Sequence, residues 1–216
     1  MRLSYWFLRF VAQWIFILYG QGRILGLQHV PRTGGVILAC NHQSFFDPIL
    51  VGLPLSRECH FMARDSLFRD RYFRLLIEFL NAFPVRRAAA DVGAIKESLR
   101  RLKQGAAIAT FPEGTRTWDG SIIPLQPGII AIAKRARCPV VPTVIEGPYE
   151  IWPRHRRLPG RARVWVEYGR PVPAEQLAKM DPDEAAGYLT DRLRTMHNAL
   201  RQRIGRWVFD YEGQTC

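Results

Sequence analysis

The sequence predicts an α/β fold: a single domain with a mainly parallel or mixed sheet flanked by helices, preceded by an N-terminal apolar helix at the membrane interface. Short apolar runs typical of strands alternate with longer amphipathic runs typical of helices, a pattern that favours a parallel sheet covered on both faces. The 216 residues are enough to bury a proper core, and no domain boundary is evident after residue 30. The most hydrophobic stretch of the chain lies at its N-terminus.

The N-terminal stretch MRLSYWFLRFVAQWIFILYG predicts a membrane-associating helix at residues 1–22, with residues 23–216 forming the main domain. A helix over Leu3–Tyr19 would be about 25 Å long, which is shorter than the roughly 30 Å hydrocarbon core of a bilayer. We therefore expect it to lie in the interface with its aromatic side chains in one leaflet; packing on the protein's own core is the alternative. Its polar residues share one narrow stripe: Arg2, Arg9 and Gln13.

The remaining elements are predicted in chain order from the spacing of apolar residues. The clearest helix lies at 91–105, because Asp91 can cap its start and Gly105 can end it. The expected series is a strand at 34–40, a strand at 59–63, a helix at 67–80, a helix at 91–105, a strand at 106–111, a helix at 127–137, strands at 139–145 and 161–169, and a long amphipathic helix at 182–207.

The composition is that of a folded and strongly basic protein. Hydrophobic residues make up 48% of the chain and charged residues 23%, which excludes both a disordered chain and one with many membrane spans. The formal net charge of +12 favours anionic partners, which include nucleic acid, anionic lipid head groups and phosphorylated or acidic-protein substrates. The sequence contains no evident helix-turn-helix, zinc-finger or RNP-like motif, so a nucleic-acid-binding protein is the less favoured alternative.

The cysteines and histidines predict neither a metal site nor a disulfide framework. No CxxC pair and no HExxH spacing occurs, and this usage fits a reducing compartment. We therefore expect no metal and no cofactor. The four cysteines are widely separated: Cys40, Cys59, Cys138 and Cys216.

Three groups of polar residues follow predicted apolar elements. They are NHQSFFD at 41–47, NAFPVRR at 81–87 and FPEGTRTWDG at 111–120. Open α/β sheets bind ligands beyond the carboxyl ends of their strands, so this order favours convergence of the three groups at one site.

In the first group, His42 is the best general base in the chain, because a neutral imidazole can accept a proton near neutral pH. Such a base works better when its other ring nitrogen donates to a carboxylate, and Asp47 can supply one if residues 43–46 form a tight turn. The alternative is a strand end followed by a helix that Ser44 caps. A lone His-x4-Asp pair does not separate the two.

In the third group, four consecutive residues combine an acid, a flexible backbone, a hydroxyl and a guanidinium. A glycine lets the backbone approach a ligand closely, and arginine donates bidentate hydrogen bonds to phosphate oxygens. The alternative is an ordinary surface turn. The residues are Glu113, Gly114, Thr115 and Arg116.

Taken in order, NHQSFFD, NAFPVRR, FPEGTRT and VVPT resemble the four motifs of the glycerolipid acyltransferase family, which includes the PlsC-like 1-acylglycerol-3-phosphate O-acyltransferases. The first is the HX4D motif, and the similarity spans residues 30 to 170. The resemblance implies transfer of a fatty acyl group from acyl-CoA or acyl carrier protein, as co-substrate, to the free hydroxyl of a lysophospholipid. The expected acceptor is 1-acyl-sn-glycerol 3-phosphate, and the expected product is phosphatidic acid.

Carried over to this sequence, the resemblance implies that His42 is the general base and Asp47 its orienting partner. Val141 and Pro142 would shape the acyl or acceptor pocket. The phosphate and glycerol region of the acceptor would be held by Arg116 with Glu113, Gly114 and Thr115, and a second cation would come from Arg87.

Three positions depart from the family pattern. Asn81 stands where glycine is usual, Arg86 where an acid or another polar residue is frequent, and Gln126 where lysine is common. These changes bear on the acceptor head group. The alternative acceptors are a lyso-ornithine lipid or lysophosphatidylglycerol.

The expected location is the cytoplasmic face of a bacterial inner membrane, where a lysophospholipid is presented from the bilayer. WPRHRRLPGRAR, residues 152–163, is a dense cationic stretch that could face anionic lipid, the phosphates of CoA or an acidic carrier protein. The alternative for this stretch is a solvated loop.

Overall fold

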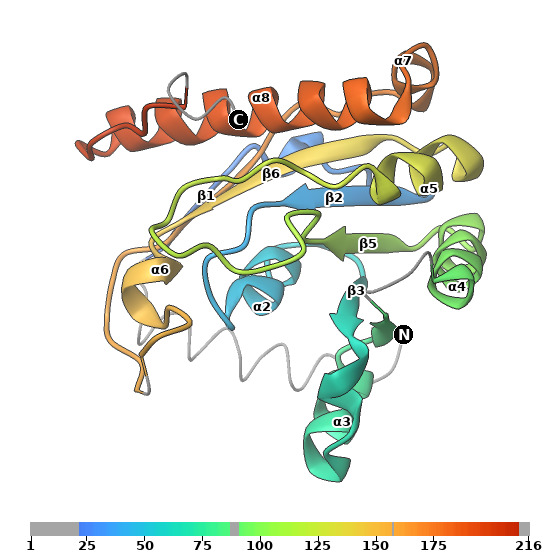
Figure 1. Cartoon of the computed structure of the whole chain (residues 1–216), viewed down its shortest axis with the longest axis horizontal. Helices are drawn as coiled ribbons and strands as arrows, with labels where there is room; N and C mark the ends of the chain where they lie inside the picture. The colour runs from blue at the N-terminus through green and yellow to red at the C-terminus, as the bar shows by residue number, and fades with distance from the viewer. Residues whose placement is uncertain (1–21, 87–90, 157, 212–216) are drawn as a thin grey trace.

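The computed structural model describes residues 22–86, 91–156 and 158–211. Its centre is a seven-stranded sheet with the order β1-β7-β6-β2-β5-β3-β4 (Figure 1). The pair β6 and β7 is antiparallel and the other neighbouring pairs are parallel, so the predicted α/β sheet is mixed. The strands are β1 Arg23–Leu25, β2 Val36–Cys40, β3 Cys59–Arg64, β4 Ala82–Val85, β5 Ala107–Thr110, β6 Val140–Glu146 and β7 Trp165–Tyr168.

Helices cover both faces of the sheet. Buried side chains of α4, α5, α7 and α8 pack with one face, and α2, α6 and the inner side of α3 pack with the other. Figure 1 shows α8 running along β6 and α3 projecting away from the rest of the molecule. The helices are α2 Asp47–Gly52, α3 Arg71–Phe79, α4 Val92–Lys103, α5 Gly128–Ala136, α6 Pro148–Ile151, α7 Ala174–Ala178 and α8 Pro182–Arg203, with short 3-10 helices at Leu27–His29 and Asp65–Phe68.

The central strands form because their side chains are apolar on both faces. All five residues of β2 are buried, as are the four of β5 and the seven of β6. A strand in the middle of the sheet faces a helix layer on each side, so its residues are mostly apolar rather than alternating. These strands place their carboxyl ends at one edge of the sheet, where the arrowheads of β2 and β5 point in Figure 1.

The predicted helix ends are confirmed where a cap was identified. The Asp91 side chain accepts a hydrogen bond from the backbone N–H of Ala94 at 3.0 Å, and Gly105 adopts the left-handed conformation with φ +81°. Helix α8 begins with a capping box in which Asp181 and Glu184 bond each other's backbone. The long amphipathic helix therefore starts at the predicted residue.

Other boundaries differ from the prediction for local reasons. The helix predicted at 67–80 begins only at Arg71, because the Asp70 side chain caps it through the Phe73 N–H at 2.7 Å. The tail helix ends at Arg203 rather than 207, because Gly205 adopts a left-handed φ of +72°. Four short elements were not predicted, since a run of three to five residues carries too few repeats of a period: β1, β4, α6 and α7.

The N-terminal apolar helix predicted at 1–22 lies outside the described residues apart from residue 22. Its placement at a membrane interface therefore stays a prediction. Within the part of the chain that the structure describes, no helix combines the length and apolar character needed to cross a bilayer.

Candidate active site

The first and third polar groups meet at the carboxyl edge of the sheet. They follow β2 and β5, which are adjacent and parallel, with Ala39 in register with Thr110. Two backbone contacts join them: the His42 N–H donates to the Glu113 carboxylate at 2.7 Å, and the Thr117 N–H donates to the His42 carbonyl at 2.8 Å. The convergence expected from strand order is confirmed for these two groups.

His42 and Asp47 form a direct pair. The Nδ1 of His42 lies 2.8 Å from Oδ2 of Asp47, and the two side chains are 14% and 0% exposed. With the Nδ1 proton donated to the carboxylate, Nε2 is the nitrogen that can accept a proton. The Phe111 ring stacks on the imidazole, with centroids 4.2 Å apart and an angle of 25° between planes. The ring orientation is thus fixed on two sides.

The turn between His42 and Asp47 is shaped by the same carboxylate. Besides the imidazole, Oδ2 accepts the backbone N–H groups of Gln43 at 2.6 Å and Ser44 at 2.7 Å. Ser44 does not cap the following helix, since its hydroxyl donates to the Trp152 carbonyl at 2.9 Å. The alternative of a Ser44-capped helix is therefore wrong, and the polar residues of this turn serve the His42–Asp47 pair.

Glu113 lies beneath the turn, 3% exposed. One oxygen accepts the His42 N–H, and the other accepts the Ile123 N–H at 3.3 Å. Burial raises the pKa of Glu113 to about 8, against the opposing effect of these two N–H donors. Glu113 thus joins the turn at residues 42–47 to the segment that precedes α5. The part in acceptor binding that we predicted for it stays a prediction.

The loop next to the His42–Asp47 pair contains Gly114, Thr115 and Arg116. Gly114 has φ +72°, and a Cβ there would come within 2.6 Å of the Gln126 side chain. The guanidinium carbon of Arg116 lies 3.5 Å from the centre of the Phe45 ring. Arg116 is therefore held over the turn that carries His42, and Gln126 lies against the backbone of the same loop.

The second polar group does not join this site as a whole. Strand β4 is the edge strand, three positions from β2, and strands lie about 4.8 Å apart. The backbone N–H of Arg86 donates to Asp91 at 2.8 Å, while Arg87 lies outside the described residues, so its role as a second cation stays a prediction. Asn81 has φ +62°, the left-handed conformation that glycine favours and asparagine tolerates.

Two further residues of the site were not predicted as functional. Asn41 bonds both the N–H and the carbonyl of Ile145, at 2.7 and 2.9 Å, and so fixes the start of the turn to β6. Gln43 donates to the Gly120 carbonyl and to Glu146, both at 3.2 Å. Neither amide belongs to a catalytic residue pattern, and their partners are more than 70 residues away, so the sequence alone carried no signal for them.

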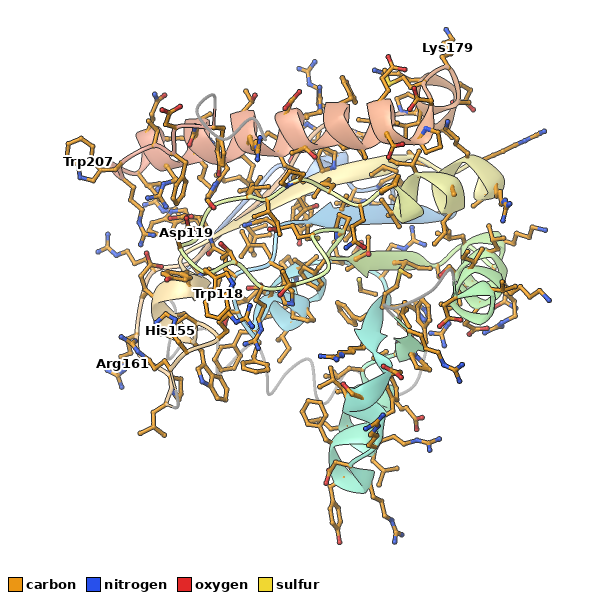
Figure 2. The ribbon with its side chains drawn as sticks, in the orientation of Figure 1. Trp118, Asp119, His155, Arg161, Lys179 and Trp207 are labelled. Carbon is orange, nitrogen blue, oxygen red and sulfur yellow. The ribbon has the colours of Figure 1, made fainter. Side chains whose placement is uncertain are left out.

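The cationic stretch at 152–163 borders the loop of the third group. The guanidinium carbon of Arg154 lies 3.6 Å from the Trp118 ring centre, and its Nη1 donates to the Thr115 hydroxyl at 3.4 Å. Figure 2 shows Trp118, His155 and Arg161 on the same side of the molecule, far from Lys179. This stretch therefore adds positive charge beside the site.

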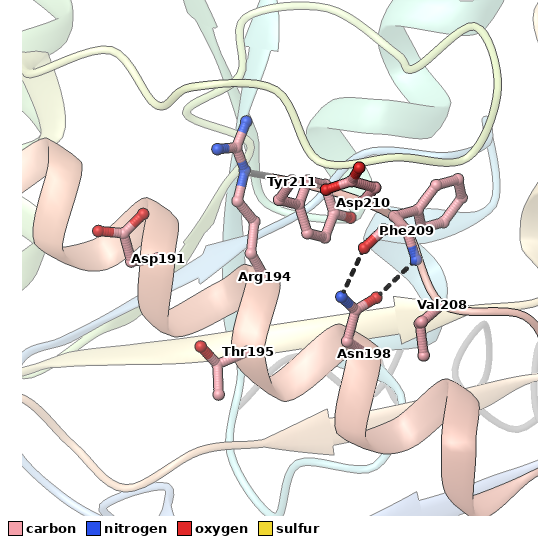
Figure 3. Close-up of a pocket in the computed structure, with 8 residues that line it drawn as sticks. All are labelled: Asp191, Arg194, Thr195, Asn198, Val208, Phe209, Asp210 and Tyr211. Atoms are coloured by element: carbon pink, nitrogen blue, oxygen red, sulfur yellow. Dashed lines mark hydrogen bonds between the residues drawn. The ribbon is translucent and has the colours of Figure 1, made fainter. Parts of the chain in front are cut away.

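Two other features bear on ligands. Among the described residues no group of three or more histidine, cysteine or acidic side chains could hold a metal ion. A depression of about 590 Å³ lies away from His42, between α8 and the segment that follows it (Figure 3). It is lined by Asp191, Arg194, Thr195, Asn198, Val208, Phe209, Asp210 and Tyr211.

Comparison with protein families gives a match over more than half of the chain. The model of the family described as Acyltransferase matches residues 22–146. This range contains His42, Asp47 and the loop that ends at Arg116.

Individual relatives agree with the family match. A 1-acyl-sn-glycerol-3-phosphate acyltransferase of Bacillus subtilis is 29% identical over 191 residues, which are 88% of this chain and 89% of the relative. A Streptococcus pneumoniae protein of the same name is 26% identical over 213 residues, 97% of this chain and 77% of the relative. Among solved structures, the 1-acyl-sn-glycerophosphate acyltransferase PlsC from Thermotoga maritima is similar with a TM-score of 0.77 and 25% identity, over 95% of this chain and 81% of that one.

Proposed function

The chain belongs to the Acyltransferase family, as a PlsC-like enzyme, and from this premise we propose that it transfers a fatty acyl group from a thioester to the free hydroxyl of 1-acyl-sn-glycerol 3-phosphate, giving phosphatidic acid. The observation that carries the proposal is the 2.8 Å contact between His42 and Asp47 beside a loop bearing Arg116. The relatives named as 1-acyl-sn-glycerol-3-phosphate acyltransferases support this acceptor.

The proposed reaction is a direct transfer. Nε2 of His42 takes the proton of the acceptor hydroxyl. At the same time the oxygen of that hydroxyl attacks the thioester carbonyl carbon, so that a tetrahedral oxyanion forms. The carbon–sulfur bond then breaks, and the imidazolium returns the proton to the leaving thiolate. Asp47 stabilises the imidazolium through Nδ1 and holds the ring orientation. No covalent acyl-enzyme is required, because the acceptor oxygen attacks the thioester directly. The nearby Ser44 hydroxyl donates its hydrogen bond to the Trp152 carbonyl.

The rate acceleration is divided between the general base and the alignment of the substrates. A positioned general base contributes about 10²–10⁴-fold to the rate. Alignment of the two substrates and hydrogen bonds to the oxyanion would supply the rest, because well-oriented reactions reach effective molarities of about 10⁵–10⁸ M. His42 therefore needs an acceptor held firmly next to Nε2.

We assign that hold to Arg116. Its guanidinium can form planar, paired hydrogen bonds with a phosphate, and the Phe45 ring beneath it limits its rotation. Thr115 and the backbone at Gly114 flank it, and Arg154 adds a second positive charge through its contact with Thr115. A phosphate bound here would bring the glycerol hydroxyl toward the His42 turn.

The proposal places the reaction at a membrane surface. Its support is the exposed apolar side of α3, where Tyr72, Leu75 and Leu76 are 80%, 59% and 44% exposed, together with the strongly basic composition. Acyl-CoA and acyl carrier protein both carry negative charge and both suit the cationic stretch at 152–163 as donors.

The test compares acceptors and a matched pair of variants. Purified protein is incubated with labelled acyl-CoA or acyl carrier protein and either lysophosphatidic acid or an uncharged monoacylglycerol. We expect Arg116→Ala to raise KM for lysophosphatidic acid by about 10–100-fold, the worth of one charge-assisted pair, with little change for monoacylglycerol. Arg135→Ala, on the exposed last turn of α5, serves as the control and should match the wild type.

Two results would contradict the proposal. Wild-type protein that acylates a lyso-ornithine lipid or lysophosphatidylglycerol but not lysophosphatidic acid would overturn the acceptor. Equal losses on the charged and uncharged acceptors in Arg116→Ala would overturn the phosphate-binding role.

A further inference from the structure

The last residue of β6, Glu146, is a buried carboxylate that the proposed reaction does not use. Its side chain is 1% exposed, and it lies at the carboxyl edge of the sheet. The turn at residues 42–47, which we call the catalytic turn, lies at the same edge. The match to the Acyltransferase family ends at Glu146. The partners of Glu146 on α8 and on the segment after it therefore lie beyond the matched range.

Four donors satisfy the Glu146 carboxylate, two at each oxygen. Oε1 accepts from Arg201 and from Arg206, each at 2.5 Å, and Oε2 accepts from His197 at 2.6 Å and from Gln43 at 3.2 Å. The hydrogen bonds and charges of these groups outweigh burial and lower the pKa of Glu146 to about 2. The carboxylate is thus ionised and held from opposite sides by α8 and by the catalytic turn.

Gln43 is the link to that turn. It directly follows His42, and its backbone N–H donates to Asp47 at 2.6 Å while its side-chain Nε2 donates to Glu146 and to the Gly120 carbonyl. The side-chain oxygen accepts the Tyr149 N–H at 3.4 Å. A shift of this side chain therefore moves the backbone that places both members of the catalytic pair.

The C-terminal part of the described chain fixes the other side of Glu146. After the left-handed turn at Gly205 the chain returns along α8, where Asn198 bonds the N–H and the carbonyl of Phe209 at 2.9 and 2.8 Å (Figure 3). His197, 0% exposed, donates through Nε2 to Glu146, and its Nδ1 lies 3.0 Å from the Tyr211 hydroxyl.

A second path leads from this segment back to the site. The Tyr211 hydroxyl accepts the Ile122 N–H at 3.1 Å, and the next N–H, that of Ile123, donates to Glu113. Glu113 in turn accepts the His42 N–H. The same end of α8 therefore contacts the catalytic turn through two separate sets of hydrogen bonds.

We propose that Glu146 is a positioning residue for the acyl transfer: acting through Gln43, it couples α8 and the segment 206–211 to the placement of His42 and Asp47. Its hydrogen-bond partners are Gln43, His197, Arg201 and Arg206, and not His42. Its loss should therefore lower the rate of the chemical step and leave substrate binding nearly unchanged. This inference rests on the proposed function for its kinetic part.

A structural role alone would have a different consequence. Helix α8 is also joined to the sheet by Arg203 and Glu167, 2.6 Å apart, an ion pair that makes no contact with the catalytic turn. If Glu146 only fastened α8 to the sheet, removing either carboxylate, that of Glu146 or that of Glu167, would change the free energy of unfolding and leave kcat unchanged in the folded protein. Glu146 is thus the test and Glu167 the control.

The experiment measures kcat and KM for lysophosphatidic acid in folded full-length variants. We expect Glu146→Gln to lower kcat by about 10–100-fold with KM within about threefold of the wild type, as for a displacement on the order of 1 Å in the reacting geometry. Glu167→Gln should retain the wild-type kcat. Gln43→Leu cuts the link while leaving the contacts between Glu146 and α8 in place, and it should reproduce the loss in kcat.

The double variant Gln43→Leu/Glu146→Gln tests whether Glu146 acts on the catalytic turn through Gln43. If Glu146 acts through Gln43, the double variant should be no slower than Gln43→Leu alone, because the two changes break the same link. Losses that multiply would overturn the coupling. Unchanged kcat in Glu146→Gln, or an equal loss in Glu167→Gln, would overturn the positioning role.

A second measurement does not depend on the substrate. Hydrogen exchange of the peptide covering residues 41–47 should accelerate in Glu146→Gln and in Gln43→Leu, and stay at the wild-type rate in Glu167→Gln. Unchanged exchange in the first two variants would overturn the inference. If the wild-type protein failed to acylate any lysolipid while exchange behaved as expected, the proposed function would fail and the coupling would stand.

Discussion

At the scale of single residues, the site is organised by carboxylates in three different environments. Asp47 accepts three hydrogen bonds at one oxygen and orients the base. Glu113 has a pKa raised to about 8 by burial, and Glu146 has a pKa lowered to about 2 because His197, Arg201 and Arg206 outweigh the effect of its burial. Asp47 holds the imidazole, Glu113 holds the backbone N–H of His42, and Glu146 accepts a hydrogen bond from the side chain of Gln43.

The raised pKa of Glu113 predicts a pH dependence of stability. An unfolded glutamate loses its proton near its ordinary pKa of 4.5, whereas the folded protein keeps it up to about pH 8. Between these values the folded state binds more protons, so this group makes the free energy of unfolding fall as pH rises, by at most about 1.4 kcal/mol per pH unit. Glu146 has the opposite sign: its contribution is present above pH 4.5 and is lost as pH falls toward 2.

Urea unfolding of Glu113→Gln at several pH values between 5 and 8 checks this prediction. The variant should show a shallower decline of stability with pH than the wild type, because the amide does not titrate. Glu175→Gln, at an exposed site on α7, should retain the wild-type slope. Parallel curves for wild type and Glu113→Gln would contradict the raised pKa.

The residues of the candidate site divide into those that the sequence could predict and those that it could not. His42, Asp47 and Arg116 stand out because their side-chain chemistry fits the reaction and their motifs follow predicted strands. Gln43 and Glu146 do not, because an amide and a carboxylate acquire a positioning role only through partners distant in sequence, such as His197. The alternative that Ser44 caps the helix was wrong. A serine shortly before a helix is a typical cap, but the hydroxyl of this one donates to the Trp152 carbonyl, a contact that the sequence does not reveal.

At the scale of secondary structure, the predicted cap at Asp91 marked the start of α4 correctly. Asp181 caps α8 in the same way, with a side-chain oxygen that accepts the unpaired N–H groups of the first turn, but this cap was not predicted. Short elements such as β4 and α7 were missed, because three to five residues hold no complete hydrophobic period. The Asp70 cap moved the start of α3, since local hydrogen bonding prevails over apolar spacing.

The α8 capping box predicts a stability change without a catalytic one. Replacing Asp181 by alanine removes the acceptor for the Asp183 and Glu184 N–H groups, and should lower the free energy of unfolding by about 0.5–2 kcal/mol. The cap is at the end of α8 remote from Glu146, so kcat should not change. Denaturant unfolding with a parallel activity assay checks both parts. Asp183→Ala, which leaves the Asp181 cap in place, should cost less; equal costs would contradict the capping role.

At the scale of the whole molecule, the mixed sheet brings residues 41–47, 113–117 and 146 to one edge. Alternating strands and helices predicted a sheet with both faces covered, and that expectation is confirmed. The antiparallel pairing of β6 and β7 and the edge position of β4 could not be predicted, because strand order depends on tertiary packing. This order places β4, with the described part of the second polar group, three positions from β2.

The net charge of +12 predicts electrostatic binding to anionic bilayers. Each basic side chain near such a surface contributes about 1 kcal/mol at low salt, and screening shortens the reach of this attraction to about 3 Å at 1 M salt. Co-sedimentation with phosphatidylglycerol-containing vesicles should therefore weaken as salt is raised. Vesicles of phosphatidylcholine alone serve as the control, and equal, salt-independent binding to both would contradict the electrostatic part of the account.

The role of His42 as general base of a direct acyl transfer is tested most directly by kcat for His42→Ala with lysophosphatidic acid and an acyl thioester. We expect a loss of about 10²–10⁴-fold in protein that remains folded. His29→Ala is the control, because that ring bonds the Tyr168 carbonyl and lies outside the proposed site; it should keep the wild-type kcat. A His42→Ala variant that forms product at the wild-type rate would contradict the claim.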